Sequence, residues 1–482
     1  MTPTLTPATD LFDTVVKNGC CIGCGACAAF DPGIRIGLDE FGRYVAKRQH
    51  ENTPVAPVAA RVCPFADGVP DENELAREAF GAETQFEPHV GYHVANYAGW
   101  VVESDYRAQG SSGGLASWVL VELLNRRLVD HVVHVAPQPT SGADAPLFRF
   151  AISSTPEEVR AKSKSRYYPV EMSGVITEML QRPGRYAVVG IPCFIKAIRL
   201  ACRESAVLKE RVAFTVAIVC GHLKSTAFAE LFAWQCGIAP AELRAIDFRT
   251  KLPDRPALDY AVTVTGDHDG QPVTVTKPTS ELIGSNWGHG FFKYKACDFC
   301  DDVVGETADI SVGDAWLPEY VSDSGGTNVV VVRSRVLNSI LAGAVGEGRL
   351  HLDSIPVAKV VASQAGGFRH RRDGLAYRLH LEDQTGRWHP PKRVEPSASH
   401  LTPKLREIYA LRYELGQTSH AAFAAAKAKQ NFSAFVAAMK PLTSRYDAHY
   451  RRPLLLRALG KIKRTLLAPF RKKAVKRLLI QA

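Results

Sequence analysis

The sequence of 482 residues predicts an α/β protein built on a mixed sheet, with a cysteine-rich segment before it and a helical, basic extension after it. Apolar strands are followed by helices, as in YAVVG at 186–190 and the helix at 194–202, which is typical of a parallel or mixed sheet. Five cysteines lie between Cys20 and Cys63. Past residue 400 the chain is rich in Ala, Leu, Lys and Arg and is expected to be helical.

The elements follow in order. Residues 19–70 show little periodicity and are rich in Cys, Gly and Pro, so a bound group such as a metal cluster is expected to organise them. A glycine turn at 110–114 opens an apolar helix. The other expected elements are a short helix within 71–88, strands at 129–137, 186–190, 212–220, 308–316 and 327–334, a helix at 225–237 and a hairpin at 260–278.

Composition indicates an ordinary globular protein, with 46% hydrophobic and 22% charged residues. Asp10 and Asp13 interrupt the region in which a secretory signal would carry its apolar run. No stretch has the roughly 18–20 apolar residues that span a bilayer. We therefore expect a cytoplasmic protein.

The positive charge is concentrated at one end. The net charge is +10, and residues 451–482 carry eleven Lys and Arg without an acid, which leaves about −1 for the rest. The body is therefore not expected to bind nucleic acid. Within the tail, Leu455, Leu459, Ile462 and Leu466 recur at helical spacing. Such a helix lies on the anionic inner face of a membrane or packs on protein, and both interpretations stay open.

The first group of cysteines has the spacing of a cluster site. Cys21, Cys24 and Cys27 form CxxCxxC, and Cys63 precedes a proline, as the last ligand of ferredoxin-type sites often does. Soft thiolates select iron–sulfur clusters or zinc. The spacing favours a [4Fe–4S] cluster over a four-cysteine zinc site. Whether Cys20 or Asp31 joins the ligands is left open.

A second group is spread more widely. Cys193 and Cys220 each end a predicted strand, where α/β sheets place their ligands, and Cys297 and Cys300 form CxxC. A cysteine at a strand end is often only a small hydrophobe. Spacing alone leaves a second cluster and a set of core cysteines equally open. The two remaining cysteines, Cys202 and Cys236, are expected in the core.

Three further features indicate a bound nucleotide-like cofactor and its substrate. The glycine turn could hold a phosphate at a helix N-terminus, although a plain turn with an N-cap explains it as well. The stretch Lys162–Tyr168 combines cations, hydroxyls and aromatic rings, which suits a pyrophosphate and a flavin ring, or is a solvated loop. The third feature is Gly313–Trp316, which follows a strand and is expected to line the same cleft. The candidate cofactor residues are Ser111, Ser112, Gly113, Gly114, Lys162, Lys164, Ser165, Arg166, Tyr167 and Asp314.

Two charged features are harder to interpret. His222, beside Cys220, is a candidate proton donor, although a lone histidine is more often structural. The run Arg369–Arg372 is either a solvated face or an anionic substrate site.

In chain order, the segments CIGCGAC, VCPF, GSSGG, SKSRYYP, YAVVGIPCFIKAIR, VCGHLKS, CDFCDDVVGETADISVGDAW and GGTNVVVVR cover roughly residues 19–335. Together they resemble the family of coenzyme F-420 hydrogenase/dehydrogenase beta subunits, which includes 7-hydroxymethyl chlorophyll a reductase. The resemblance implies two [4Fe–4S] clusters, one on each cysteine group, and FAD, with FMN as the alternative. Asp31 stands where a two-cluster ferredoxin would have a cysteine. The family does not fix the substrate.

The expected function is that of an iron–sulfur flavoprotein oxidoreductase, which moves electrons between a one-electron donor such as ferredoxin, the clusters, a flavin and a small organic substrate or deazaflavin-type coenzyme. The alternative is an electron-relay or assembly subunit without its own substrate. The direction of electron flow stays open, as does a second copy of the chain as a partner. The expected divisions are an iron–sulfur segment at 1–88, a flavin and iron–sulfur α/β domain at 89–375 and a helical extension at 376–482.

Overall fold

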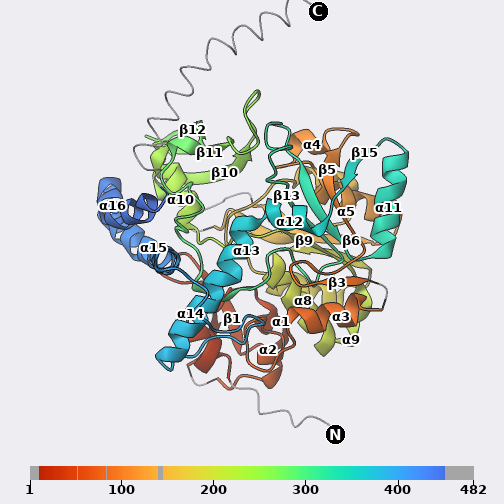
Figure 1. The fold of residues 1–482 in the computed structure, drawn as a ribbon, viewed down its shortest axis with the longest axis horizontal. Helices are drawn as coiled ribbons and strands as arrows, with labels where there is room; N and C mark the ends of the chain where they lie inside the picture. Colours follow the sequence, from red (N-terminus) through yellow and green to blue (C-terminus); the bar gives the residue numbers. More distant parts are fainter. Residues whose placement is uncertain (1–9, 52, 83, 139–144, 451–482) are drawn as a thin grey trace, which may run out of the picture.

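The computed structural model describes residues 10–51, 53–82, 84–138 and 145–450. A large sheet lies at the centre, with the N-terminal segment below it, a small sheet above and the C-terminal helices along one side (Figure 1). The predicted tail helix of 451–482 lies outside the described residues. No helix among the described residues has the length and apolar character needed to cross a membrane.

The large sheet has eight strands and is mixed, as predicted. Its strands in chain order are β5 (Ala95–Val101), β6 (His131–Pro137), β7 (Phe148–Ser153), β8 (Tyr186–Gly190), β9 (Val212–Ile218), β13 (Ile310–Asp314), β14 (Asn328–Val332) and β15 (Leu350–Ser354). In space the order is β15-β5-β14-β13-β9-β8-β6-β7. The pairs β13–β9, β9–β8 and β8–β6 are parallel, so the carboxyl ends of these four strands lie at one edge.

Helices cover both faces of the sheet because its strands are apolar on both sides. Val330 packs in one core, whereas Val329 and Val331 pack in another, as the two-residue repeat of a strand requires. Helices α5 (Leu115–Asn125) and α11 (Arg335–Gly346) cover the Val330 face. Helix α8 (Pro192–Glu204) covers the opposite face, against Val188. The result is a three-layer arrangement.

Shorter elements connect these layers. The helices among them are α3 (Glu72–Phe80), α4 (Tyr106–Gln109), α6 (Pro156–Ala161), α7 (Ser173–Gln181), α9 (Ala206–Arg211), α10 (Ala227–Gln235), α12 (Val357–Ser363) and α13 (Ala365–Arg371). Strands β3 (Gln85–Glu87) and β4 (Gly91–His93) form a small ribbon. Helix α3 confirms the helix predicted within 71–88, and a capping box between Asp71 and Glu74 fixes its start.

The N-terminal segment is more regular than its sequence indicates. It contains α1 (Ala26–Phe30), α2 (Pro57–Arg61) and an antiparallel hairpin of β1 (Ile34–Leu38) and β2 (Tyr44–Arg48). The segment docks on the α/β body through a hydrogen bond from Met172 N to Cys24 O of 2.9 Å.

A three-stranded sheet stands beside the carboxyl edge of the large one. It consists of β10 (Leu243–Thr250), β11 (Ala261–His268) and β12 (Gln271–Pro278). The last two form the predicted hairpin, which threonine pairs such as Thr263–Thr276 support across the strands.

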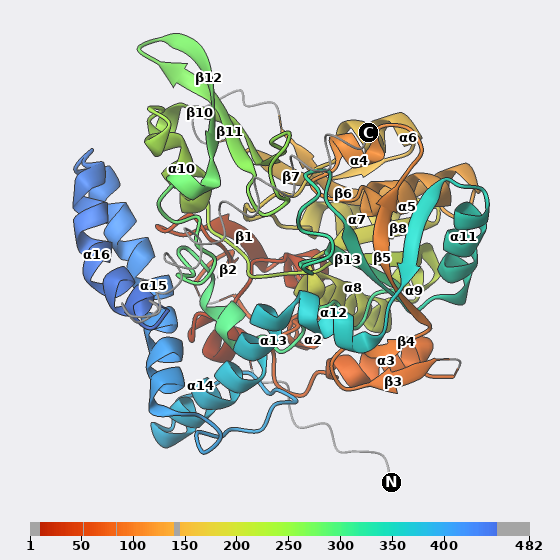
Figure 2. The same cartoon turned by 45° about the horizontal axis from the view of Figure 1, so that its top comes forward.

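The described residues past 400 are mainly helical, as predicted. Helices α14 (Asp373–Gln384), α15 (Pro403–Ala428) and α16 (Phe432–Ala448) run along one side of the molecule in both views (Figures 1 and 2). Phe423 and Phe435 pack edge-to-face against each other and contact Phe292 in the loop before Cys297. The extension is thereby fixed to the segment that carries the CxxC pair.

Candidate functional site

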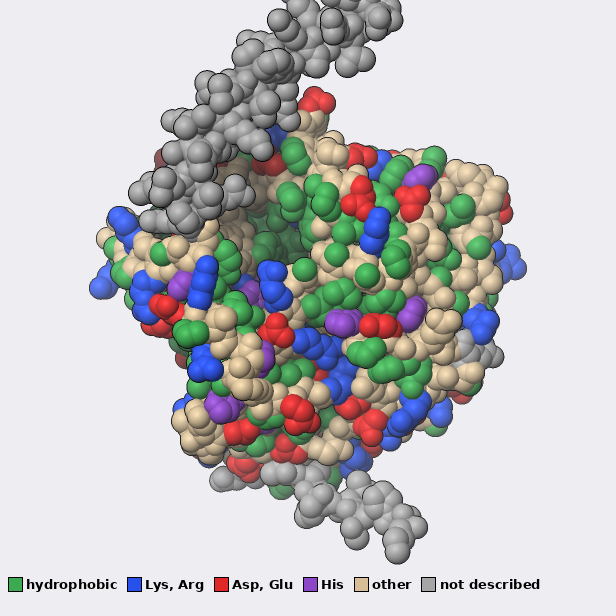
Figure 3. All heavy atoms as spheres, in the orientation of Figure 1, with side chains coloured by type: hydrophobic (Ala, Val, Ile, Leu, Met, Phe, Trp, Pro, Cys, Tyr) green, Lys and Arg blue, Asp and Glu red, His purple; other side chains and the backbone are tan. Residues whose placement is uncertain are grey.

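A cavity of about 260 Å³ lies at the carboxyl edge of the parallel strands. Figure 3 shows a hollow with hydrophobic side chains between the three-stranded sheet and the large sheet near β13. The ends of β8, β9 and β13 contribute Gly190, Ile218 and Asp314 to the cavity wall. This is where open α/β sheets bind their ligands.

The predicted cofactor residues converge on this cavity, with one exception. Those that line it are Ser111, Ser112, Gly114, Lys162, Lys164, Ser165, Arg166, Tyr167 and Asp314. The exception, Gly113, packs against strand backbone instead: a Cβ there would meet Gly99 O at 2.7 Å.

The glycine turn forms the entrance to helix α5. Gly114 is its N-cap, with φ of +88°, and a Cβ on it would meet the Tyr106 backbone at 2.6 Å. Ser111 Oγ accepts a hydrogen bond of 2.8 Å from Ser165 N, which joins the turn to the cationic loop. Ser112 Oγ donates to Thr327 O at 3.1 Å. Ser112 therefore holds the turn in place, and the N-terminus of α5 faces a wall of hydroxyls.

The loop at 162–168 places cations along the same wall. Lys162 donates to Ser153, which is also bonded to His134. Lys164 has a φ of +111°, which is strained for a residue with a side chain, and its ammonium lies 3.1 Å from Asp247. The loop is thus held in a costly conformation by contacts to neighbouring strands.

Arg166 and Asp314 have different environments. The Arg166 guanidinium stacks on Phe148, burial lowers its pKa, and its Nε has no hydrogen-bond partner among the described residues. Asp314 is already paired, since both of its oxygens accept from Arg249 at 3.1 Å. Arg249, which sequence reasoning missed, also donates to Tyr167 Oη and Ser111 O. It fastens β10 of the small sheet to the site.

At the inner end of the cavity lie His222 and Lys224. The His222 side chain is 7% exposed, its Nε2 has no partner among the described residues, and its ring lies 4.7 Å from that of Trp287. Burial and the nearby cations, led by Lys224, hold its pKa well below the usual range.

Lys224 is a second residue that sequence reasoning missed. It lies over the rings of Phe228 and Trp287 and donates to Phe291 O at 2.5 Å. It forms no salt bridge with a carboxylate in the part of the chain that the structure describes. Burial, followed by its cationic neighbours, lowers its pKa strongly. An anion in the cavity would supply the missing partner.

The second cysteine group gathers beside this inner end. Cys193 follows β8, Cys220 follows β9, and Cys297 and Cys300 lie in and after the short helix η4 (Lys295–Phe299). Burial raises the pKa of the Cys193 thiol, and the thiols of Cys300, Cys220 and Cys297 raise it further, so the four lie together. Cys220 also lines the cavity.

The first cysteine group surrounds a cavity of about 20 Å³, which is lined by Cys21, Cys24, Cys27 and Cys63. Backbone N–H groups of Gly23 and Ala46 donate to Cys21 Sγ at 3.4 and 3.3 Å. Burial, followed by the other three thiols, raises the pKa of Cys27 well above its usual value. Deprotonation of such a group is costly unless a metal binds the thiolates.

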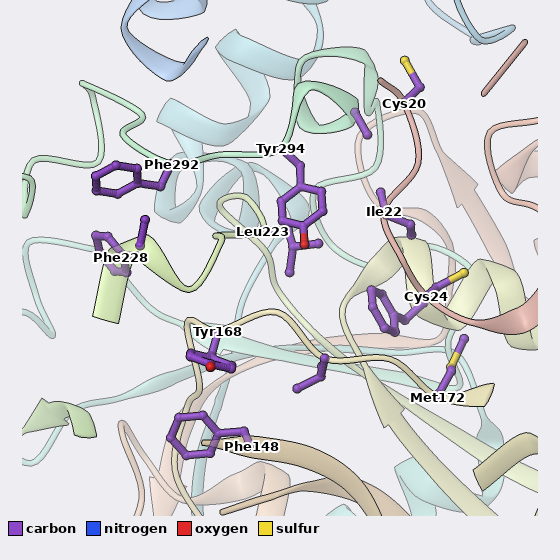
Figure 4. Packing of buried hydrophobic residues seen from close by; sticks show 14 of the residues in the cluster. Cys20, Ile22, Cys24, Phe148, Tyr168, Met172, Leu223, Phe228, Phe292 and Tyr294 are labelled. Atoms are coloured by element: carbon purple, nitrogen blue, oxygen red, sulfur yellow. The ribbon is translucent and has the colours of Figure 1, made fainter. Parts of the chain in front are cut away.

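The residues left open by sequence have structural roles. Cys20 touches the same small cavity, but its sulfur lies 3.8 Å from Asn18 O, and its side chain lies apart from that of Cys24 (Figure 4). Asp31 accepts hydrogen bonds of 2.7 Å from Gly33 N and Ala56 N, one on each oxygen. Its carboxylate therefore braces the loop around the first cysteine group.

The two cysteine groups are neighbours, because the Cys24 thiol of the first also raises the pKa of Cys193 in the second. Among the described residues, no three His, Cys, Asp or Glu side chains converge closely enough to hold one metal ion. A four-iron cluster holds its thiolates further apart than a single ion does, since iron and sulfide atoms stand between them. The four cysteines of the first group line one small cavity, an arrangement that thiolate ligands of a cluster would fit.

The run Arg369–Arg372 is not uniformly solvated. Arg369 is exposed, whereas Arg371 is 4% exposed and lies beside the second cysteine group. The solvated-face interpretation is thus wrong for Arg371, because its side chain is buried although Arg369 on the same turn of α13 is exposed. No periodicity in the sequence distinguishes the two arginines.

Thiol groups beside a cation-lined cavity at the carboxyl edge of an α/β sheet are features of an oxidoreductase. The chain belongs to the family of coenzyme F420 hydrogenase/dehydrogenase beta subunits: residues 96–177 match the N-terminal part of the family and residues 184–357 its C-terminal part. The second cysteine group lies within the matched region, whereas the first group and Arg371 lie outside it.

The chain is similar to one of the subunits of the F(420)H(2) dehydrogenase of Methanosarcina mazei, with 23% identity over 335 residues, which are 67% of this chain and 81% of that protein. A chain of the F420-reducing [NiFe] hydrogenase complex from Methanosarcina barkeri aligns with a TM-score of 0.46 and 17% identity, over 64% of this chain and 99% of that one.

Proposed function

We propose that the protein is an iron–sulfur flavoprotein oxidoreductase that carries two [4Fe–4S] clusters and a flavin. The observation that supports this most is the position of Cys220, which belongs to the second cysteine group and also lines the cavity. Helix α1, which carries Cys27 of the first group, contacts helix α8, which carries Cys193 of the second, so the two groups lie on neighbouring elements. Such an arrangement suits electron transfer between clusters and a redox ligand.

The cavity wall divides the roles of its residues. The glycine turn with Ser111, together with Lys162 and Arg166, would hold the phosphate groups of FAD, or of FMN as the alternative. Tyr167 would contact the ring system. A flavin exchanges a hydride with an organic substrate and single electrons with clusters. The protein's part is to orient both partners and to exclude water.

His222 and Lys224 would face the substrate. His222 lines the cavity beside Cys220, and its Nε2 has no hydrogen-bond partner among the described residues, so it is proposed as the proton donor. His222→Gln should keep cluster and flavin content while turnover slows. Unchanged turnover would remove the assignment.

The name of the dehydrogenase relative includes F(420), a deazaflavin coenzyme. A coenzyme of that type is therefore the first candidate substrate, followed by other small organic molecules. A one-electron donor such as ferredoxin would exchange electrons with the first cluster. The relay alternative predicts no turnover by the isolated chain with artificial donors and these substrates.

The proposal can be tested by measuring the content of iron, acid-labile sulfide and flavin per chain after anaerobic purification. We expect about eight irons, about eight sulfides and one flavin, which released-flavin chromatography identifies as FAD or FMN. Cys220→Ser should reduce the iron to about four. Cys202→Ser is the matched control, since Cys202 lies in α8 outside both groups, and should keep the full content. Bound zinc, or iron without flavin, would contradict the proposal.

A further inference from the structure

Helix α13 ends in an arginine that is buried against the second cysteine group. Arg371 Nη2 donates to Gly221 O at 2.7 Å, directly after Cys220. Its Nη1 donates to Asp302 O, two residues after Cys300. These contacts hold one side chain against the backbone that carries two of the four cysteines.

Arg371 lacks the partner that buried arginines usually have. It makes no salt bridge with a carboxylate in the described part of the chain, and its main electrostatic partners are the thiols of Cys300, Cys220 and Cys297. A buried guanidinium without a counter-ion is costly. Because arginine stays protonated in proteins, the cost is offset only by negative charge at the cysteines.

Neighbouring buried cations differ in this respect. Arg393 lies 2.6 Å from Glu306 and 3.0 Å from Asp301, and Arg372 also pairs with Glu306. Carboxylates therefore balance the cations on the far side of Cys300. Arg371 is left to face the thiols.

We propose that Arg371 is the counter-ion of the second cysteine group and raises the reduction potential of the [4Fe–4S] cluster that binds there. This rests on the proposed function. Reduction adds an electron to a centre that is already negative through its four thiolates. A fixed positive charge beside the ligand sulfurs favours the reduced form. The effect is large because the site is buried, where charges are weakly screened.

The position of Arg371 also bears on electron transfer between the two clusters. A raised potential at the second group favours electron transfer from the first cluster to the second. The potentials of the electron donor and the substrate set the overall direction. The first group has backbone N–H donors but no arginine in hydrogen-bond contact among the described residues.

An EPR-monitored redox titration of the anaerobic holoprotein tests the role of Arg371. Arg371→Gln should keep the iron content and shift the midpoint potential of one cluster to a lower value, while the other stays unchanged. Arg369→Gln is the matched control on the same helix and should match the wild type, since Arg369 is exposed. Cys27→Ser, which should remove the first cluster, identifies the signal that shifts.

Unchanged potentials in Arg371→Gln with full iron content would overturn the proposal. If Arg371→Gln loses the second cluster, Arg371→Lys decides: it keeps the charge and should retain the cluster near the wild-type potential. Loss of the cluster in Arg371→Lys as well would show that shape, not charge, matters, and would also overturn it. A wild-type protein with only one cluster would instead refute the proposed function.

Discussion

Replacing Arg249 by Met tests how the small sheet is fastened to the site. Arg249 is 4% exposed and pairs with both oxygens of Asp314. Breaking a buried pair by removing one partner costs about 3–5 kcal/mol. The Asp314 side chain is 22% exposed, so water offsets part of the loss. We therefore expect a decrease of about 3 kcal/mol in the free energy of unfolding.

The same change should weaken flavin binding. Arg249 also holds Ser111 O and Tyr167 Oη, which belong to the cavity wall. If the whole 3 kcal/mol were needed to close the site around the flavin, its Kd would rise by roughly 100-fold, which is the upper limit. Denaturant unfolding of the holoprotein measures the free energy of unfolding. Fluorescence titration of the flavin-free protein with flavin measures the Kd. Arg244→Met, on the same strand but half-exposed, should change both by little.

The comparison with Asp314→Asn separates two roles of the aspartate. If Asp314 acts by holding Arg249, Asp314→Asn and Arg249→Met should each lose flavin, and the double variant should lose little more. If the carboxylate contacts the flavin directly, Asp314→Asn alone should lose it. An Arg249→Met protein with wild-type stability and flavin content would refute the reasoning.

Four further predictions concern other parts of the molecule. Lys224→Met removes a buried cation without a carboxylate, so unfolding free energy should rise by about 1 kcal/mol while kcat/KM for an anionic substrate falls at least about tenfold; unchanged kinetics would contradict this. Gly114→Ala should destabilise by about 2 kcal/mol and lose flavin, whereas Gly174→Ala, with open space around it, should not. Burial lowers the pKa of His134 to about 4, so the unfolded chain binds the extra proton and stability should fall as pH drops from about 6.5 to 4; His134→Gln should flatten the unfolding profile there. Iron removal should expose the β1–β2 hairpin to hydrogen exchange before β9, because a two-stranded hairpin alone is marginal; equal protection would refute a cluster-dependent segment.

Much of the central fold could be predicted because its strands carry a strong local signal. YAVVG and VAFTVAIVC are continuous apolar runs, and they became β8 and β9. Because β8 and β9 are parallel, their carboxyl ends lie at one edge of the sheet, which brings Cys193 and Cys220 close together. Strands β5, β7 and β10 were missed, since sequences such as ANYAGWV and LRAIDFRT contain glycine or charged residues within the strand.

The buried cationic side chains of the site could not be predicted. Arg249, Lys224 and Arg371 are buried by contacts with residues far along the chain, and a lone cation in a sequence is normally solvated. Lys224 carried no clear signal, because it stands among mainly polar residues between Gly221 and Thr226. Arg371 carried none, since it stands in a run of charges with an exposed neighbour.

These missed cations extend the argument for redox cofactors beyond the cysteine motifs. Around Cys300, carboxylates such as Asp301 and Glu306 balance the buried cations. On the cavity side, Lys224 and Arg371 have no such partners among the described residues. Burial of Arg371 without a counter-ion is costly, whereas Lys224 can respond to burial by losing its proton. Under the proposed function, the thiolates of a cluster would offset the charge of Arg371, and an anionic flavin or substrate in the cavity would favour the protonated form of Lys224.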